Sequence, residues 1–384
     1  MREYIVLRRE APQGRTGFAS LASKGAEPAE PSLSLERIPA HALAELNAEP
    51  DVALVAPKMP TRLIAPQNSR ATRHKPCWGA EAVGATASQY TGAGVSVAVL
   101  DTGIDATHPA FAGLELLEKD FSGDGNGDVQ GHGTHCAGTI FGSGLGERIG
   151  VAPGVSRALI GKVLANDGSG SSEMVFDGLL WALDQRADIV SLSLGFDFTG
   201  MVKTLAGNGW PVQLATSNAL ETYRANLRMF DALMAMTKAR AAFGSSTLVI
   251  AAAGNESRRQ TDPEYRIAAS LPAAADDVLS VAAIGRDGAY YSVADFSNCF
   301  ATLCAPGVDI TSAWPGGGLK TLSGTSMACP YVAGVAALWW EAIAATGKKA
   351  NARNVRAKLV GTAQVSRFEK LDEVDVGQGV VVAP

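Results

Sequence analysis

The chain alternates short apolar runs with longer stretches of helical periodicity. Runs of β-branched and small apolar residues suited to buried strands are VSVAVL, ALIGKVL, DIVSLSL, TLVIAAAG and VLSVAAIG, all between residues 95 and 285. Strands that alternate with helices predict a mostly parallel sheet covered by helices on both faces. The pattern therefore predicts an α/β domain over residues 78–384.

The first 65 residues follow a different pattern. Strand-like YIVLRRE and DVALVAP flank a Pro/Ala/Gly/Ser-rich stretch and a short helical segment, HALAELNAE. This predicts a small α+β domain over residues 1–65. Residues 66–77 are polar, contain Pro, Arg, His and Lys, and read as a linker.

A candidate nucleophile, Ser326, lies in GTSMACP, where a loop turns into the apolar helix TSMACPYVAGVAALWWEA. Backbone N–H groups at a helix start have no intrahelical partners, and the helix dipole there favours negative charge. An oxyanion formed at Ser326 would be stabilised, so acyl transfer is the chemistry expected. Ser and Thr are also ordinary N-caps, so this motif is weak evidence when taken alone.

Two further segments supply the partners that a serine nucleophile needs. VSVAVLDTGID ends a predicted strand at Asp101, the end of a sheet where ligands bind, although a turn-capping Asp is an alternative. GHGTHCAGTI places His132 between glycines, and the usual pKa of His suits proton transfer near neutrality. His132 and His135 could also bind a metal, but no Cys or carboxylate at suitable spacing completes that site, which favours a general base.

The order Asp101, His132, Ser326, each within its full motif, resembles the subtilisin-like serine proteases (subtilases) from about Trp78 to Val382. The resemblance implies a three-layer subtilisin-like fold and a serine endopeptidase that forms an acyl-enzyme. In that family Ser326 would attack, His132 would act as the base, and Asp101 would orient the imidazole.

The resemblance also covers substrate binding. AAAGNES, residues 251–257, matches the segment whose Asn255 donates to the oxyanion, with Ala253 and Gly254 beside the substrate. An extended polypeptide would pair with strand edges. The residues implied at those edges are Ser169, Gly170, Ser171, Ser193, Leu194 and Gly195.

Residues 1–65 weakly resemble the inhibitor prodomain of the same family, which would make this segment an intramolecular inhibitor of its own chain. An accessory domain that is never removed is the alternative interpretation.

The chain departs from the family between Gly195 and Asn255, where it is longer than usual. We expect a loop over residues 196–217 that borders the substrate cleft, followed by a packed helix. The apolar residues expected in the loop are Phe196, Phe198, Met201 and Trp210. The residues expected on the packed face of the helix are Leu220, Tyr223, Leu227, Phe230 and Met234.

The proposed chemistry requires no cofactor, and structural calcium is doubtful. In HPAF, Ala110 replaces the acidic calcium ligand common in the family. A weak alternative calcium site is DGNGD, where Asp124, Asn126 and Asp128 offer oxygen ligands at alternate positions. The motif lacks a closing Glu, so a solvated turn is the favoured interpretation.

Composition narrows the remaining possibilities. The formal net charge of −5 and the absence of a long Lys/Arg cluster argue against nucleic-acid binding, and no apolar run approaches the length of a membrane span. The 5 cysteines are too few for a disulfide framework. Cys136 and Cys329 read as buried apolar residues, and a strand between Cys299 and Cys304 is expected to keep that pair apart.

The N-terminus MREYIVLRREAP does not have the pattern of a signal peptide. A cytoplasmic location is therefore the default expectation, and export by another route stays open.

Two alternatives to hydrolysis remain at this point. A peptide ligase or macrocyclase would use the same nucleophile, base and oxyanion donors, and would need a capping insertion that excludes water. A non-catalytic peptide-binding protein would be expected to have lost part of the triad.

Overall fold

The computed structural model describes residues 1–8, 32–67, 77–143, 149–241 and 244–384. Its core is a sheet with strand order β13-β12-β11-β9-β5-β7-β6, and β14 also pairs with β12. All pairs are parallel except β12 with β13. The strands are β5 (Ser96–Asp101), β6 (Glu115–Asp120), β7 (Arg157–Lys162), β9 (Ile189–Leu192), β11 (Leu248–Ala252), β12 (Leu279–Asp287), β13 (Tyr290–Val293) and β14 (Leu303–Pro306).

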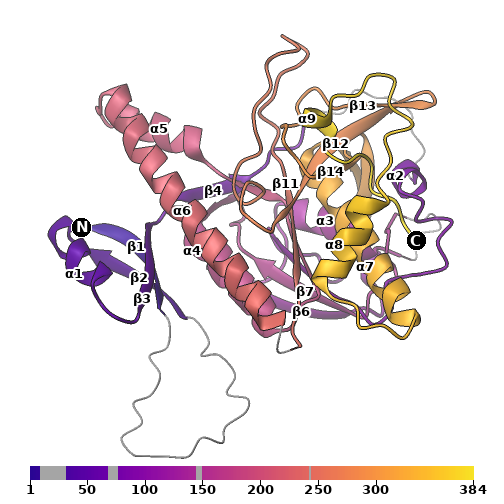
Figure 1. Ribbon diagram of the computed structural model, residues 1–384, viewed down its shortest axis with the longest axis horizontal. Coiled ribbons are helices and arrows are strands. Elements are labelled where there is room, and N and C mark those ends of the chain that lie inside the picture. The colour runs from indigo at the N-terminus through magenta and orange to yellow at the C-terminus, as the bar shows by residue number, and fades with distance from the viewer. Residues whose placement is uncertain (9–31, 68–76, 144–148, 242–243) are drawn as a thin grey trace, which may run out of the picture.

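Helices cover both faces of this sheet, as the alternation of strands and helices predicted (Figure 1). Alternate residues of β5 enter opposite cores: Val97 and Val99 join one apolar cluster, and Ala98 and Leu100 join the other. The first core includes residues of α3 (His132–Phe141) and α7 (Thr325–Ala345), and the second includes residues of α4 (Ser172–Asp184) and α6 (Val212–Arg240). The predicted three-layer α/β fold is confirmed.

Helix α7, from Thr325 to Ala345, is predominantly apolar, with Glu341 as its one charged residue. By length and hydropathy it could cross a membrane, so the expectation that no apolar run approaches that length is wrong. However, 83% of its apolar window is buried inside the protein, as in the core helix of a globular domain.

Smaller elements complete this part of the molecule. The hairpin of β15 and β16 packs beside α3, and α8 packs beside α7. Their bounds, with those of the other short helices, are α2 (Trp78–Ala82), η2 (Pro109–Phe111), β15 (Ile310–Trp314), β16 (Gly318–Leu322), α8 (Ala352–Gly361) and α9 (Glu373–Val376).

The N-terminal residues form a separate antiparallel sheet of β1 (Arg2–Arg8), β2 (Ser32–Ile38) and β3 (Val52–Pro57), with β1 central. A 3-10 turn, η1 (Ala40–Ala42), and the short helix α1 (Leu43–Asn47) cover one face. From the other face, Ile5 and Leu7 pack into the core that contains α4 and α6, and β3 lies along α6 (Figure 1).

The predicted small α+β domain is present, although β2 was not foreseen. Residues 9–31, and 68–76 of the predicted linker, lie outside the described residues.

The expectation of a loop over residues 196–217 is wrong. The segment folds into α5 (Phe198–Gly207), which packs on α6, and α6 itself begins at Val212 (Figure 1). The Asp197 carboxylate caps α5 by accepting from Gly200 N at 3.0 Å. Phe198 packs edge-on against Tyr223, with ring centroids 6.1 Å apart, whereas Trp210 is exposed.

The packed face of α6 is partly as predicted. Phe230 and Met234 are buried and Tyr223 and Leu227 are half-buried, but Leu220 is 47% exposed. The buried stripe instead passes through Ala219, Thr222 and Asn226. The apolar periodicity gave the wrong face at the N-terminal part of α6, because small and polar residues of the helix pack against the N-terminal sheet. Arg2 donates to Thr222, and Asn226 donates to the Pro57 carbonyl.

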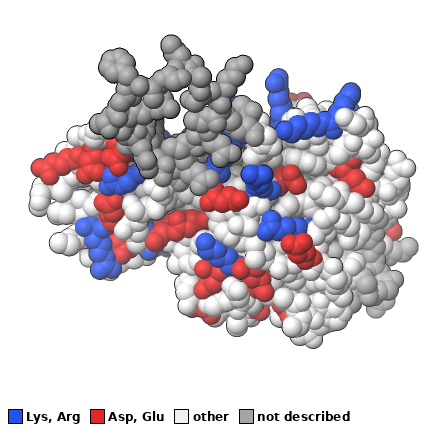
Figure 2. Space-filling view, turned by 90° about the horizontal axis from the view of Figure 1, so that it is seen from below, with Lys and Arg blue, Asp and Glu red and all other residues white. Residues whose placement is uncertain are grey.

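Cys299 and Cys304 are both buried thiols, with no disulfide between them. Cys136 and Cys329 are buried as well, as predicted. On the face shown in Figure 2, Lys and Arg side chains lie among Asp and Glu side chains.

Phe230 offers a direct test of the packing of α6. Its ring lies 5.5 Å from Phe176 and 6.4 Å from Phe196, centroid to centroid. We expect Phe230→Ala to lower the free energy of unfolding by about 3–5 kcal/mol, because it leaves a cavity in a closed aromatic cluster. Leu220→Ala, on the exposed face of the same helix, should change it by less than about 0.5 kcal/mol. Urea denaturation measures both, and equal effects would contradict this packing.

Candidate active site

The three predicted catalytic motifs meet at one edge of the central sheet. Asp101 ends β5, His132 begins α3 and Ser326 is the second residue of α7. The Nδ1 atom of His132 lies 2.8 and 3.0 Å from the two carboxylate oxygens of Asp101, and both side chains are 1% exposed. A carboxylate can only accept, so Nδ1 carries a proton, and in the neutral imidazole Nε2 is the nitrogen with the lone pair.

The nucleophile and the base are close in the fold but not hydrogen-bonded. Ser326 Oγ donates to the Ser193 carbonyl oxygen at 3.3 Å, and Ser193 Oγ donates back to the Ser326 carbonyl at 3.1 Å. His132 Nε2 is buried and has no hydrogen-bond partner among the described residues. Catalytic hydrogen bonds often tighten only when substrate binds, so this geometry fits a resting arrangement.

A thiol lies beside the candidate triad. Cys136 Sγ is 3.7 Å from His132 Nδ1 and 3.5 Å from the Ser326 carbonyl oxygen. Asp101, His132 and Cys136 are the one group of potential metal ligands that the described residues bring together. Burial, reinforced by the Asp101 charge, raises the pKa of Cys136, which disfavours the thiolate that a metal or a competing nucleophile would require.

His135, the alternative metal ligand of the sequence analysis, lies away from this group. Its Nε2 atom is 3.1 Å from the carbonyl oxygens of Ile310 and Lys320, one on each strand of the β15–β16 hairpin. Burial, with a contribution from His132, lowers the pKa of His135 to about 3. The ring therefore stays neutral and anchors the hairpin to α3.

Asn255 follows β11 and points its amide at a backbone carbonyl. Its Nδ2 atom donates to the Ala65 oxygen at 3.1 Å, while its Oδ1 atom accepts from both the amide and the hydroxyl of Thr325 at 2.9 Å. Those two bonds fix which end of the amide faces the carbonyl. Thr325 was not singled out from the sequence, although its place beside Ser326 was the available signal.

The loop that carries Asn255 is braced from within. Gly254 adopts a φ of 115°, and its amide donates to Thr325 Oγ1 at 3.1 Å. Asn298 accepts from the amides of Glu256 and Ser257, and donates to the Ala253 carbonyl. Ala253 and Gly254 are therefore hydrogen-bonded to Asn298 and Thr325, whereas Asn255 contacts the chain just beyond the strand β4 (Pro60–Leu63), at Ala65.

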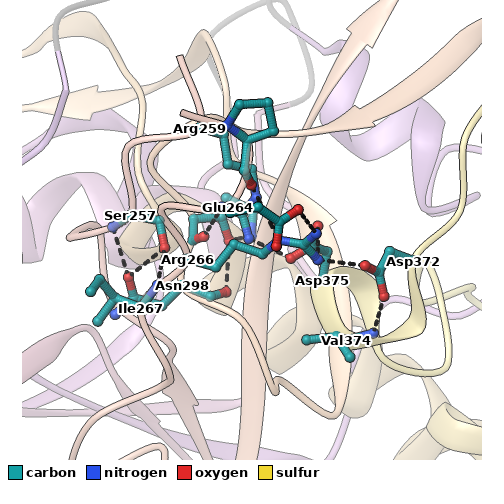
Figure 3. A network of polar contacts seen from close by, with 12 residues as sticks. Ser257, Arg259, Glu264, Arg266, Ile267, Asn298, Asp372, Val374 and Asp375 are labelled. Atoms are coloured by element: carbon teal, nitrogen blue, oxygen red, sulfur yellow. Dashed lines mark hydrogen bonds and ion pairs between the residues drawn. The ribbon is translucent and has the colours of Figure 1, made fainter. Parts of the chain in front are cut away.

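Beyond that loop, a network of charged side chains joins it to the C-terminal region (Figure 3). Arg259 pairs with Asp375 and donates to the Ser297 carbonyl, and Arg266 pairs with Asp372. The side chains of Arg259 and Asp375 are 8% and 10% exposed, so this ion pair is shielded from solvent. It ties α9 to the segment after Asn255.

The candidate substrate strands are occupied by the chain itself. β4 lies between β8 (Ser169–Ser171) and β10 (Leu194–Phe196), antiparallel to both. The predicted edge residues pair as follows: Ser169 with Arg62, Gly170 with Thr61, Ser171 with Pro60, Leu194 with Leu63 and Gly195 with Arg62. Ser193 instead contacts Ser326. Beyond β4, Gln67 N donates to the Ser323 carbonyl at 2.7 Å.

An open cavity of about 1190 Å³ borders this strand and Asn255. Thr199 and Lys203 of α5 line it. The inserted segment does border the cleft, but its lining residues are polar. The apolar side chains expected there lie elsewhere, with Phe196 buried and Phe198 and Met201 packed against the core.

The three candidate calcium ligands do not share one environment. Asp124 and Asn126 are exposed, whereas Asp128 is buried. The Asp128 carboxylate accepts from Thr102 Oγ1 and the Gly131 amide through one oxygen, and from the amide and hydroxyl of Thr134 through the other. Asp128 thus joins the turn after Asp101 to the start of the His132 helix, a contact that the sequence did not reveal.

Comparison with known proteins identifies the family of this chain. The sequence profile of the subtilase family, peptidase S8, matches residues 92–380. An intracellular serine protease of Paenibacillus polymyxa is 36% identical over 258 residues, which cover 65% of this chain and 68% of that protein. The subtilisin-like serine protease Pen ch 13 of Penicillium rubens is 33% identical over 323 residues, covering 82% of this chain and 71% of that protein. The chain belongs to the subtilase family of serine proteases.

Proposed function

We propose that this serine protease is an endopeptidase that cleaves extended polypeptides through Asp101, His132, Ser326 and Asn255. The observation that carries the proposal is the placement of a peptide carbonyl, that of Ala65, on Asn255 Nδ2 at 3.1 Å, at the start of the helix that bears Ser326. A substrate carbonyl at that point would lie within reach of the nucleophile and the oxyanion donors together.

The proposed mechanism assigns one role to each group. Ser326 Oγ attacks the scissile carbonyl after rotating from the Ser193 carbonyl toward His132 Nε2, which removes its proton. Asp101 holds the tautomer and stabilises the imidazolium that forms. His132 then protonates the leaving amine, and water releases the acyl group by the reverse sequence. No step in this mechanism uses a cofactor.

Hydrolysis is favoured over the two alternatives. Transfer of the acyl group to an amine would call for an insertion that shuts out water. The inserted α5 instead packs on α6 and leaves the cavity beside Asn255 open. A purely peptide-binding protein would not need a buried base whose Nε2 is unpartnered, because such a group costs free energy to bury.

The N-terminal segment is proposed to be an intramolecular inhibitor. It fills the strand position between β8 and β10, and Ser326 is fully buried in this arrangement. Its small sheet is also docked on α6, where Arg2 Nη2 donates to Thr222 at 2.7 Å and Asn226 donates to the Pro57 carbonyl at 2.9 Å.

The register of β4 explains how the segment could resist cleavage. Gly195 pairs with Arg62 and Leu194 with Leu63, so a strand continuing in register would place Ile64 opposite Ser193 and beside Ser326. The carbonyl on Asn255 belongs to the following residue, Ala65. The peptide bond whose carbonyl lies on Asn255 is therefore the Ala65–Pro66 bond, one residue beyond the bond that the strand register would place there. Its nitrogen belongs to Pro66, and the proline ring crowds this leaving group.

The proposed location is cytoplasmic. The buried thiols and the name of the Paenibacillus relative, an intracellular serine protease, support it.

The first prediction concerns the triad. Ser326→Ala, His132→Ala and Asp101→Ala should each lower casein hydrolysis by several powers of ten, because the three groups act as a unit. Ser156→Ala, at the opposite edge of the sheet, is the matched control and should keep wild-type activity. A chelator should leave the wild-type rate unchanged. Substantial casein cleavage by folded Ser326→Ala protein would exclude the assignment.

The second prediction separates the oxyanion donor from the residue that positions it. Asn255→Ala should lower kcat about a hundredfold or more with little change in KM, since its bond strengthens in the transition state. Thr325→Val removes one of the two donors to Asn255 Oδ1 and should lower kcat by about five- to tenfold. Steady-state kinetics on a peptide substrate measure both, and a defect confined to KM would assign Asn255 to substrate binding instead.

The third prediction concerns the N-terminal segment. The separately prepared segment 1–65 should inhibit the processed enzyme. Intact-mass measurement should find wild type shortened and Ser326→Ala at full length. The segment is a permanent accessory domain if both proteins remain full length and both still bind substrate peptides, with wild type also hydrolysing them.

A further inference from the structure

Arg62 of β4 projects from the cleft strand toward two carboxylates. Its Nη1 atom is 3.4 Å from Asp197 Oδ1, and its Nη2 atom is 3.5 Å from Glu256 Oε1. In the part of the chain that the structure describes, neither carboxylate forms another ion pair. We propose that Asp197 and Glu256 form a specificity subsite for a basic side chain of the substrate, at the position opposite Gly195. This inference rests on the proposed endopeptidase function.

The two carboxylates are held in place by contacts that do not involve Arg62. Asp197 Oδ1 accepts from Gly200 N at 3.0 Å as the cap of α5, and Glu256 Oε2 accepts from Asn298 Nδ2 at 2.8 Å. Each carboxylate thus keeps its position when β4 leaves the cleft. A pre-positioned pair loses little conformational entropy when a guanidinium or ammonium group arrives.

The backbone ladder determines which substrate residue meets this pair. A peptide that replaces β4 must use the same edges of β8 and β10, and its side chains will alternate between the two faces of the strand. Thr61 is 2% exposed, whereas the Arg62 side chain is 46% exposed and lies between the two carboxylates. The neighbouring substrate positions therefore point away from Asp197 and Glu256.

Other charges near the subsite limit the size of the effect. Lys203 and Arg258 line the same cavity as Glu256, and neither is paired with Asp197 or Glu256. The Glu256 side chain is 38% exposed and that of Asp197 is 19% exposed, so water and salt screen the interaction. A preference of about three- to tenfold for a basic residue is the expected scale.

The test compares arginine with citrulline, which has nearly the same shape and no charge. Quenched fluorescent peptides carry one or the other at the third or the fourth residue before the cleaved bond. The third residue faces Asp197 and Glu256 if the residue before the cleaved bond lies opposite Ser193. The fourth residue faces them if the residue before the cleaved bond lies where Ala65 does, with its carbonyl on Asn255. Full-length protein is suitable, because an N-terminal segment that competes with substrate lowers both kcat/KM values equally and leaves their ratio unchanged.

We expect the arginine peptide to have a kcat/KM about fivefold higher at one of these positions, and the ratio to fall toward one in high salt. In the double variant Asp197→Asn, Glu256→Gln, the ratio of the two kcat/KM values should be close to one. Asn remains a good helix cap, and Gln can still accept from Asn298, so both elements keep their support. Asp184→Asn, which loses an ion pair with Arg240 on the surface, is the matched control and should keep the wild-type ratio.

The outcomes separate this inference from the proposed function. If both peptides are cleaved equally at both positions, or if the preference persists in the double variant, the subsite assignment is wrong. If no peptide is cleaved and a serine-directed phosphonate fails to label Ser326, the endopeptidase proposal itself fails.

Discussion

The parallel arrangement of three adjacent strands, β11, β9 and β5, is the constraint on which the candidate site depends. Parallel neighbours end at the same edge of a sheet, so the chain leaving β5 at Asp101, β9 toward Ser193 and β11 toward Asn255 emerges at one place. Helix α7 packs against β9 and β11 and starts at that edge. Residues separated by more than two hundred positions are thereby brought together without any loop that must reach far.

The sheet brings the site residues near one another, and hydrogen bonds between the loops then fix their positions. Asp128 joins the turn after Asp101 to the first turn of α3, and Thr325 joins the first turn of α7 to Asn255. Both are buried side chains whose donors and acceptors find partners inside the protein. A site built this way is positioned by several independent contacts, which suits chemistry that tolerates little displacement of the reacting groups.

The sequence predicted the sheet and its layers, because strand and helix periodicities are local properties. It also singled out Asp101, His132 and Ser326, which the fold brings to one edge of the sheet. It did not predict α5, whose cap at Asp197 depends on a single side chain, or the exposed face of α6 at Leu220. It also missed β4, since PTRL carries no periodic signal of its own and becomes a strand only where two open edges accept it. The role of Asp128 was hidden for the same reason: its partners lie on two different segments of chain.

β4 occupies the strand position between β8 and β10, where the proposed substrate would bind. A segment of the same chain has a high effective concentration at the cleft, so even weak side-chain contacts can keep it bound. Strand pairing supplies affinity that is nearly independent of sequence, and the ion pairs of Arg62 add a contact that depends on one side chain. A substrate that displaces β4 would pair with the same strand edges, so under the proposed function the residues that hold the N-terminal segment would also discriminate among substrates. Under the same proposal, the side chains of β4 indicate which side chains the cleft binds, and the segment departs from a substrate at Ala65, whose carbonyl lies on Asn255.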